Sequence, residues 1–517
     1  MHTTTKAVPV GTGPLSFADV VAVARDAAPV EIAAQSWAEV RRSRAVIEAL
    51  ADDLEPHDGV STGFGALATR HIPVELRAQL QRSLIRSHAA GSGPEVETEV
   101  VRALMLLRIS TLARGRTGVR SETLAAYADL LNARITPVVY EYGSLGCSGD
   151  LAPLAHCALA LMGEGVVRTE GSERQPAAEA LAAAGLKPIT LAEKEGLALI
   201  NGTDGMLGML VLAITDLREL VKVADITAAM SVEGLLGTDH VFAADLHALR
   251  PHPGQVASAA NLRALMAGSQ IRASHDTDDC PRVQDAYSLR CSPQVTGAAR
   301  DTIAHAAGVA EIELGAAIDN PVVTPDGRVE SNGNFHGAPI AYQLDFLAIV
   351  AADLASIAER RTDRFLDRAR NAGLPPFLAD DAGVDSGHMI AQYTQAAIVS
   401  ELKRLAVPAS VDSIPSSAMQ EDHVSMGWSA ARKLRRAVDG LTRVLAVELL
   451  TAARGVELRS PLSPAPATGA VIVALRAAGV PGPGPDRWLA PEIDAAVQLI
   501  TSGAAVAAAE SVVGPLA

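Results

Sequence analysis

Four long stretches of this 517-residue chain carry apolar residues at the spacing of one face of an α-helix. They cover residues 204–230, 296–317, 338–366 and 425–453. A helix of such length must bury a wide apolar stripe against other helices. We therefore expect a mainly α-helical fold, in which long helices form a central bundle with faces wide enough to pack against other subunits.

The composition agrees with helix packed on helix. Apolar residues make up 49% of the chain but aromatic residues only 3%, which favours helices over a β-sandwich. The net charge of −15 offers no basic stripe for nucleic acid. We expect an N-terminal domain over residues 1–203, the long-helix bundle over 204–460, and a C-terminal helical segment over 461–517 that packs on the bundle.

Metal, disulfide and membrane signals are absent from the sequence. Four cysteines are too few for a disulfide framework, and neither C-x-x-C nor H-E-x-x-H occurs. The N-terminus has no apolar core of signal-peptide length, and the most apolar internal stretch, residues 205–215, is bracketed by Asp204 and Asp216. We expect a cytoplasmic protein with no metal and no membrane segment.

The sequence "GSLGCSGD", residues 143–150, places small and flexible residues between helical segments. The Gly149 nitrogen has no Cβ beside it, so it can fold back and attack the Cys147 carbonyl. Loss of one water closes a five-membered ring, and loss of the Ser148 hydroxyl as a second water leaves an exocyclic methylene. The product is a carbon electrophile, which no ordinary side chain provides. A bare Cys-Ser-Gly is more often an interhelical turn, so the flanking sequence decides between the two.

The flanking sequence resembles that of the aromatic amino acid ammonia-lyases and aminomutases, in ordered blocks from residue 59 to residue 427. The blocks are "GVSTGFGALA", "RSHAAG", "GSLGCSGDLAPLAH", "LALINGTDG", "VQDAYSLRCSPQVTG", "DNPVV", "NGNFHGAP" and "SVDSIPSSAMQEDHVSMG". The resemblance implies a 4-methylideneimidazole-5-one (MIO) group formed from Cys147, Ser148 and Gly149, without an external cofactor. Cys147 stands where the family usually has Ala, but that residue donates only its carbonyl. By resemblance Asp150 assists ring formation.

Five further residues match family positions around substrate and cofactor. By resemblance, Asn201 binds the ring or the substrate carboxylate, and Gln284 supports the cofactor. Tyr287 handles protons near the amine, and Arg290 pairs bidentately with the substrate α-carboxylate. Phe335 packs against substrate or cofactor. Taken alone, Asn201 could be a buried structural Asn and Arg290 a surface Arg. Tyr287 and Phe335 could be aromatic residues of the core.

His88, in "RSHAAG", and Glu421, in "MQEDH", match the histidine-specific members of the family. A carboxylate facing an imidazole makes a charge-assisted hydrogen bond. An apolar substrate would leave both groups unpaired, at a cost of about 1–3 kcal/mol each. The resemblance implies elimination of ammonia from L-histidine to give trans-urocanate. A structural ion pair for Glu421 and a satisfied core histidine for His88 are the alternatives.

Asp58 departs from the family pattern, which has Tyr at this place before "GVSTGFG". The pKa of Asp is about 3.9 and that of Tyr about 10, so Asp58 cannot donate a phenolic proton at neutral pH. Three explanations stay open: a carboxylate base, a substrate with an additional positive charge, or a catalytically impaired homologue. The alternatives to a histidine lyase are therefore a 2,3-aminomutase, a lyase for another polar amino acid, or a silent homologue.

The resemblance also implies a homotetramer in which each active site combines segments from three subunits. The matching motifs are scattered from residue 58 to residue 421, on elements too long to converge easily within one subunit. We therefore expect isolated monomers to be inactive.

Overall fold

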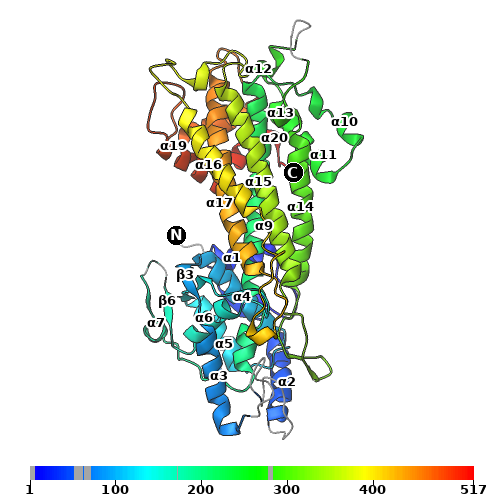
Figure 1. Cartoon of the computed structure of the whole chain (residues 1–517), viewed down its shortest axis with the longest axis vertical. Coiled ribbons are helices and arrows are strands. Elements are labelled where there is room, and N and C mark those ends of the chain that lie inside the picture. Colours follow the sequence, from blue (N-terminus) through cyan, green and yellow to red (C-terminus); the bar gives the residue numbers. More distant parts are fainter. Residues whose placement is uncertain (1–5, 52–61, 63–71, 170, 172, 277–282) are drawn as a thin grey trace. The chain divides into compact units, whose positions relative to one another are not determined.

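A computed structural model describes residues 6–51, 62, 72–169, 171, 173–276 and 283–517 of the chain (Figure 1). The protein is mainly α-helical, which confirms the predicted fold class. It divides into two compact units, each assembled from separate stretches of sequence. Unit 1 comprises residues 1–212, 307–345 and 408–432, and unit 2 comprises residues 213–306, 346–407 and 433–517. The three-part division expected from the sequence remains a prediction.

Unit 1 is built around one buried helix. Every residue of α4 (Thr98–Ala113) from Val100 to Ala113 is buried, including two arginines. The surrounding helices are α1 (Phe17–Ala24), α2 (Ala34–Ala51), α3 (Val74–His88), α5 (Ser121–Asn132), α6 (Leu151–Leu161), α7 (Ala177–Ala183) and α8 (Glu195–Ile200). The sequence starts α1 with a capping box, because the Ser16 hydroxyl accepts from the Asp19 amide while the Asp19 carboxylate accepts from the Ser16 amide.

The strands of unit 1 are short and pair within small sheets. Strands β1 (Val8–Val10) and β2 (Val30–Ile32) are parallel, and β3 (Ser92–Glu95) pairs antiparallel with β5 (Tyr140–Tyr142). A three-stranded antiparallel sheet has the order β4 (Thr136–Pro137), β6 (Val166–Arg168), β7 (Gln175–Pro176). Strands β8 (Val322–Val323) and β9 (Val329–Glu330) form an antiparallel pair.

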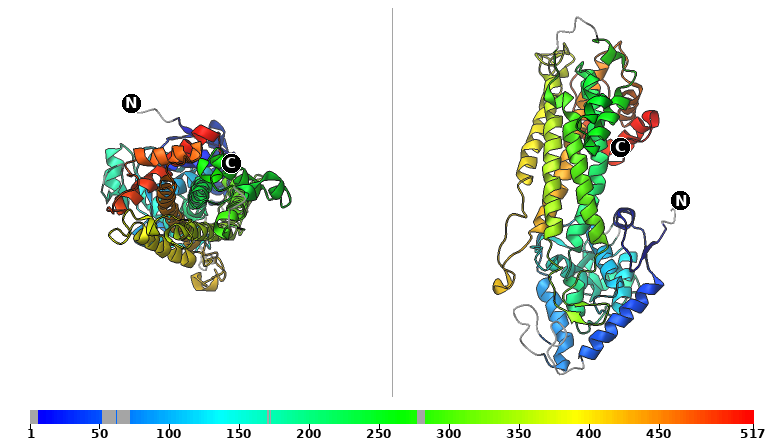
Figure 2. Two further views of the ribbon diagram at one scale, coloured as in Figure 1. Left: turned by 90° about the horizontal axis from the view of Figure 1, so that it is seen from above. Right: turned by 90° about the vertical axis from the view of Figure 1, so that its right-hand side faces the viewer.

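Four long helices correspond to the four periodic segments of the sequence. They are α9 (Asp204–Gly234), α14 (Ser292–Leu314), α15 (Ala338–Leu366) and α17 (Gly427–Glu457). Figure 2 shows them running alongside one another. Within unit 2 a buried ion pair joins Arg361 of α15 to Glu448 of α17, and the Ser231 hydroxyl of α9 donates to Glu448 at 2.9 Å. Arg361, Glu448 and Ser231 therefore satisfy one another inside the bundle.

Shorter helices complete unit 2. They are α10 (Ala244–Ala248), α11 (Pro253–Met266), α12 (Gln270–Ala273), α13 (Tyr287–Arg290), α16 (Met389–Leu405), α18 (Pro466–Ala477), α19 (Ala490–Thr501) and α20 (Ala504–Val513). Helix α15 is long and apolar enough to cross a membrane, by length and composition alone. The same holds for α19 and α20 if this bent pair is taken as one segment. The apolar window of α15, with a mean hydropathy of 1.6, is 61% buried inside the protein, as expected for the core helix of a bundle.

Candidate active site

The loop of residues 143–150 lies where long helices begin. The Gly337 amide, just before α15, donates to the Gly146 carbonyl at 3.1 Å. The Met426 amide, just before α17, donates to the Leu145 carbonyl at 2.8 Å. Because the N-terminus of a helix carries partial positive charge, the loop is placed where negative charge is stabilised.

Gly149 has a backbone that only glycine can adopt here. Its φ is +76°, and a Cβ added to it would lie 2.1 Å from the Gly202 carbonyl oxygen. The neighbouring Asp150 amide donates to that same carbonyl at 2.7 Å, which ties the loop to the residues before α9. The tripeptide therefore has a backbone conformation at Gly149 that a residue with a side chain could not adopt at this place.

Glu421 contacts both of the preceding residues of the tripeptide. The Cys147 thiol and the Ser148 hydroxyl each donate to its carboxylate at 3.2 Å, and the Ser416 hydroxyl donates to it at 2.7 Å. Burial, together with the charge of Glu421, raises the pKa of the Cys147 thiol to about 12. The thiol stays protonated and donates, so a carboxylate from a segment far away in sequence is held directly at the loop.

Asp150 supplies a buried carboxyl next to the tripeptide. The Ser144 hydroxyl donates to it at 3.0 Å and the Met206 amide at 2.9 Å. Complete burial raises its pKa to about 7 despite these hydrogen bonds. A carboxyl with this pKa populates both its protonated and its ionised form near neutral pH, so it can exchange a proton beside Gly149.

Asn201 is buried and follows α8 directly. Its side-chain amide donates to the Asn320 carbonyl at 2.9 Å, and its own carbonyl accepts from Arg108 of α4 at 2.9 Å. Arg108 also forms an ion pair with Asp204 at 2.9 Å. Both the side chain and the backbone carbonyl of Asn201 are therefore held by hydrogen bonds within unit 1.

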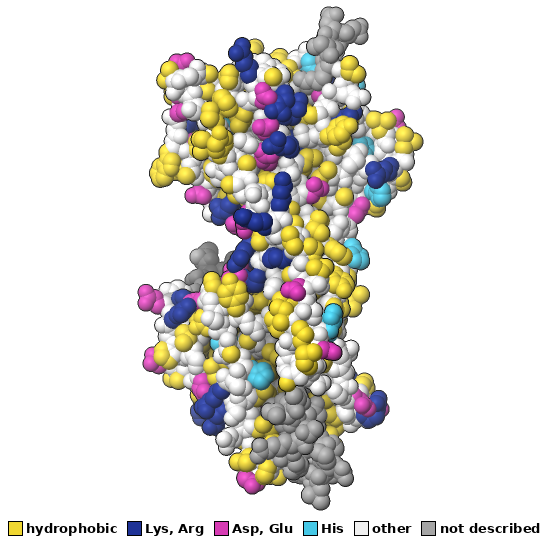
Figure 3. Space-filling model, viewed as in Figure 1, with side chains coloured by type: hydrophobic (Ala, Val, Ile, Leu, Met, Phe, Trp, Pro, Cys, Tyr) yellow, Lys and Arg dark blue, Asp and Glu magenta, His cyan; other side chains and the backbone are white. Residues whose placement is uncertain are grey.

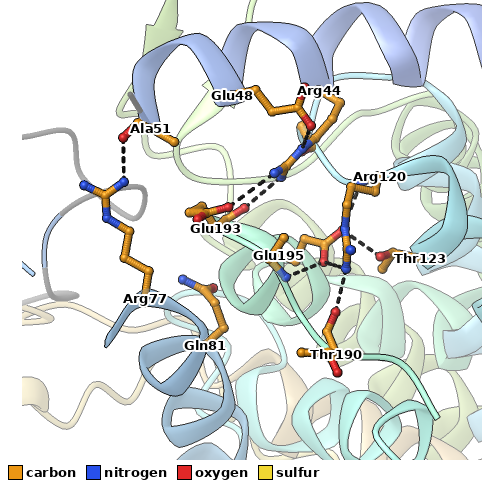
Figure 4. A network of polar contacts seen from close by, with 12 residues as sticks. Arg44, Glu48, Ala51, Arg77, Gln81, Arg120, Thr123, Thr190, Glu193 and Glu195 are labelled. Carbon is orange, nitrogen blue, oxygen red and sulfur yellow. Dashed lines mark hydrogen bonds and ion pairs between the residues drawn. The ribbon is translucent and has the colours of Figure 1, made fainter. Parts of the chain in front are cut away.

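A polar network holds α8 in place (Figure 4). Glu195, fully buried at the start of α8, accepts from Arg120 at 2.7 Å and from the Thr123 hydroxyl at 2.6 Å. Desolvation opposes its ionisation, but these hydrogen bonds outweigh it and the pKa of Glu195 is lowered. In the same region Arg44 pairs with Glu193 at 3.4 Å. The network thus orients α8, the helix that directly precedes Asn201.

A buried ion pair lies next to Asn320, the residue whose carbonyl accepts from the Asn201 side chain. Lys194 and Asp319 are both fully buried, and Lys194 Nζ lies 2.5 Å from Asp319 Oδ2. Asp319 also accepts from the Asn320 amide at 2.8 Å. Sequence reasoning missed Arg108 and Lys194, which lie in no recognised motif. The quoted motif "DNPVV" does contain Asp319 and Asn320.

We predict that Lys194→Met destabilises the protein by about 3–5 kcal/mol, because it leaves the Asp319 carboxylate buried without its counter-charge. Urea unfolding followed by circular dichroism measures the change. The double variant Lys194→Met, Asp319→Asn removes the orphaned charge and is expected to recover most of the loss. If the single and double variants were equally destabilised, the charge argument would be wrong.

His88 is the last residue of α3 and is half-buried. Its Nδ1 lies 2.9 Å from the Leu84 carbonyl, which can only accept, so Nδ1 carries the proton. Burial lowers the pKa of His88, although the nearby charge of Glu421 acts in the opposite direction. A neutral His88 therefore has Nε2 as a hydrogen-bond acceptor for another group.

The remaining predicted residues are spread over both units. Phe335, half-buried, belongs to unit 1 with the loop. Gln284, Tyr287 and Arg290 belong to unit 2. Gln284 is exposed and precedes α13, whereas the guanidinium of Arg290 lies 4.8 Å from the centre of the Tyr287 ring. Asp58 lies outside the described residues.

Within unit 1 the structure brings together the tripeptide, Asp150 and Glu421. His88 is near enough for the negative charge of Glu421 to act on its imidazole. Among the described residues, no group of three or more His, Cys, Asp or Glu side chains is arranged to hold a metal ion. The loop thus combines a glycine in the left-handed region, a carboxyl with a raised pKa and a carboxylate that accepts from both Cys147 and Ser148. Perturbed groups of this kind gather at reactive centres more often than at simple turns.

The fold of the chain superposes on several solved structures. Histidine ammonia-lyase of Trypanosoma cruzi superposes with a TM-score of 0.90 at 38% identity, over 98% of this chain and 96% of that one. Tyrosine aminomutase of Streptomyces globisporus superposes with a TM-score of 0.92 at 38% identity, over 99% and 100% of the two chains.

The sequence comparisons define the family. Residues 15–477 match the family Aromatic amino acid lyase, and the chain belongs to that family. It is 67% identical over 517 residues to histidine ammonia-lyase of Streptomyces avermitilis, and 67% identical over 516 residues to the enzyme of the same name from Streptomyces coelicolor. Both alignments cover 100% of each chain.

Proposed function

We propose that the chain is a carbon–nitrogen lyase that eliminates ammonia from L-histidine to give trans-urocanate. Family membership and the names of its relatives support the reaction class. The observation that carries the substrate assignment is Glu421, whose carboxylate lies 3.2 Å from the Cys147 thiol and 3.2 Å from the Ser148 hydroxyl. A negative charge at the reactive loop suits a substrate whose side chain is an imidazole, and it disfavours an apolar ring.

The substrate-binding roles follow from the chemistry of each side chain. In this proposal the Glu421 carboxylate accepts a hydrogen bond from the substrate imidazole, and His88 offers Nε2 on the same side. Arg290 binds the α-carboxylate through its planar fork of donors. Asn201 and Gln284 position substrate or prosthetic group, and Phe335 packs against them. Because these groups act on different parts of one amino acid, they select size and polarity together.

The MIO group belongs to this proposal, and the loop fits it. Gly149 has the required backbone conformation, Asp150 can exchange the protons that ring closure moves, and the Cys147 thiol donates to Glu421. Cys147, Ser148 and Gly149 would form the ring, and no external cofactor is then needed. Once formed, it supplies the carbon electrophile that the side chains lack.

Removal of the substrate β-proton requires a base near the loop. We assign this role to Asp58 or Tyr287, as the sequence resemblance suggests. The Arg290 guanidinium lies 4.8 Å from the centre of the Tyr287 ring, so the proposed carboxylate-binding group and this candidate base are neighbours. Asp58 would act as a carboxylate base.

We also propose a cytoplasmic homotetramer with active sites shared between subunits. Tyr287 is 71% exposed in the single chain, which is unusual for a residue with a catalytic role unless another subunit covers it. Tyr342, Phe346 and Ile349 on one face of α15 are 51%, 44% and 47% exposed. Hydrophobic side chains also gather on the surface over the long helices (Figure 3). Such an apolar stripe favours burial against other copies of the chain.

The test is the purified protein mixed with L-histidine, L-tyrosine and L-phenylalanine in turn. We expect urocanate absorbance with L-histidine and no arylacrylate with the other two. Chromatography of the products distinguishes a lyase from a 2,3-aminomutase, which would return a β-amino acid. Asp58→Tyr run in parallel tests the base: if Asp58 serves as the carboxylate base, the variant loses activity, and a gain would show that Asp58 impairs the enzyme. Product from L-tyrosine but not from L-histidine would refute the substrate assignment.

A further inference from the structure

A cavity of about 300 Å³ in unit 1 is lined by arginines from four separate segments. Arg25 follows α1, Arg102 lies on α4, Arg134 follows α5 and Arg168 ends β6. None of the described residues that line this cavity carries a carboxylate. Four arginines therefore line one small space, and they bring positive charge to it in a chain whose net charge is −15.

The arginines are held in place by the fold. Arg102 is only 5% exposed, and its guanidinium donates to the Val23 carbonyl at 2.9 Å and to the Leu131 carbonyl at 3.5 Å. Arg168 is paired across the β4–β6 ladder with Thr136, another lining residue. A site whose donors are fixed in advance loses little entropy when a ligand binds.

Carboxylates outside the lining offset part of this charge. Glu99 pairs with Arg25 at 2.7 Å, and Glu95 pairs with Arg168 through contacts of 2.8 Å and 3.0 Å. Glu95 is in turn shared with Arg174. These pairs hold the Arg25 and Arg168 side chains at the cavity wall, and Arg102 donates to two backbone carbonyls there.

We propose that this cavity binds a small molecule bearing a phosphate group. Arginine forks and threonine hydroxyls are the donors that phosphate oxygens accept from, and Thr98 and Thr136 add hydroxyls to the lining. The volume exceeds that of a single ion and suits a small phosphomonoester. A free amino acid, which carries one carboxylate beside an ammonium group, matches this lining poorly.

Isothermal titration calorimetry of the full-length protein tests the proposal, with inorganic phosphate and glycerol 3-phosphate as probes at ionic strength held constant by chloride. We expect saturable binding of one probe molecule per chain. The double variant Arg25→Gln, Arg134→Asn should weaken binding at least about tenfold, since it removes two charged donors. Asn suits position 134, where the backbone φ is +56°.

The matched control is Arg404→Gln, which removes an exposed arginine of α16 that pairs with Glu401. It should bind both probes as the unaltered protein does, and circular dichroism should show all variants folded. Absence of saturable heat with either probe would overturn the proposal. Equal affinity of the double variant and the unaltered protein would also overturn the proposal. The probe would then bind elsewhere, for instance through Arg290.

Discussion

Ser148→Ala is expected to reduce turnover of L-histidine by at least roughly 10³-fold, because the variant has no side-chain hydroxyl to leave as water and so cannot form the exocyclic methylene. The change is small in volume, and it removes one hydrogen bond to Glu421. The fold should therefore persist while the electrophile is lost. Initial rates of urocanate formation measure the effect.

Cys147→Ala is the comparison for this variant. It removes the other hydrogen bond to Glu421 but leaves the backbone carbonyl that the ring uses. We expect this variant to form the ring. If Ser148→Ala kept its rate, or if Cys147→Ala lost ring formation as fully as Ser148→Ala, the assignment of roles within the tripeptide would be wrong.

Glu421→Gln is expected to lower kcat/KM for L-histidine by roughly 10²-fold, since loss of the charged partner in a partly buried hydrogen bond costs about 2–3 kcal/mol. Gln keeps the length of the side chain and can still accept from the Cys147 thiol or the Ser148 hydroxyl, so the loop should stay in place. Steady-state kinetics with L-histidine measure the loss.

Glu330→Gln is the matched control, because Glu330 is an exposed carboxylate of β9 that pairs with Arg328. Its kinetics should equal those of the unaltered protein. The substrate assignment further predicts that Glu421→Gln loses less against an amino acid with an uncharged ring. An equal loss with every amino acid tested would indicate that Glu421 only supports the loop.

The helices and the loop were predictable because their signals are local. Helical spacing of apolar residues identified the segments that become α9, α14, α15 and α17. The loop stood out in eight consecutive residues, although its interpretation as a reactive group came from the matching blocks between residues 59 and 427. The positive φ of Gly149 is also a property of this short stretch.

The groups that fix Asn201 were not predictable, because they come from distant segments. Arg108 donates to the carbonyls of Asn201 and Ile318, the latter 210 positions away, and nothing near Arg108 in the sequence distinguishes it from a surface arginine. The contact of Glu421 with Cys147 spans 274 positions. Likewise, only the structure shows that Nδ1 of His88 is committed to Leu84, which leaves Nε2 as the nitrogen that can meet a ligand.

The most direct test of the central claim is the mass of the tryptic peptide of residues 135–168, which contains the whole loop. Ring formation from Cys147, Ser148 and Gly149 predicts a mass lower by two water molecules than the sequence requires, and the same peptide from Ser148→Ala should not show this loss. A peptide of unaltered mass from a protein that still converts L-histidine to urocanate would contradict the account, because the electrophile would then have to come from another part of the chain.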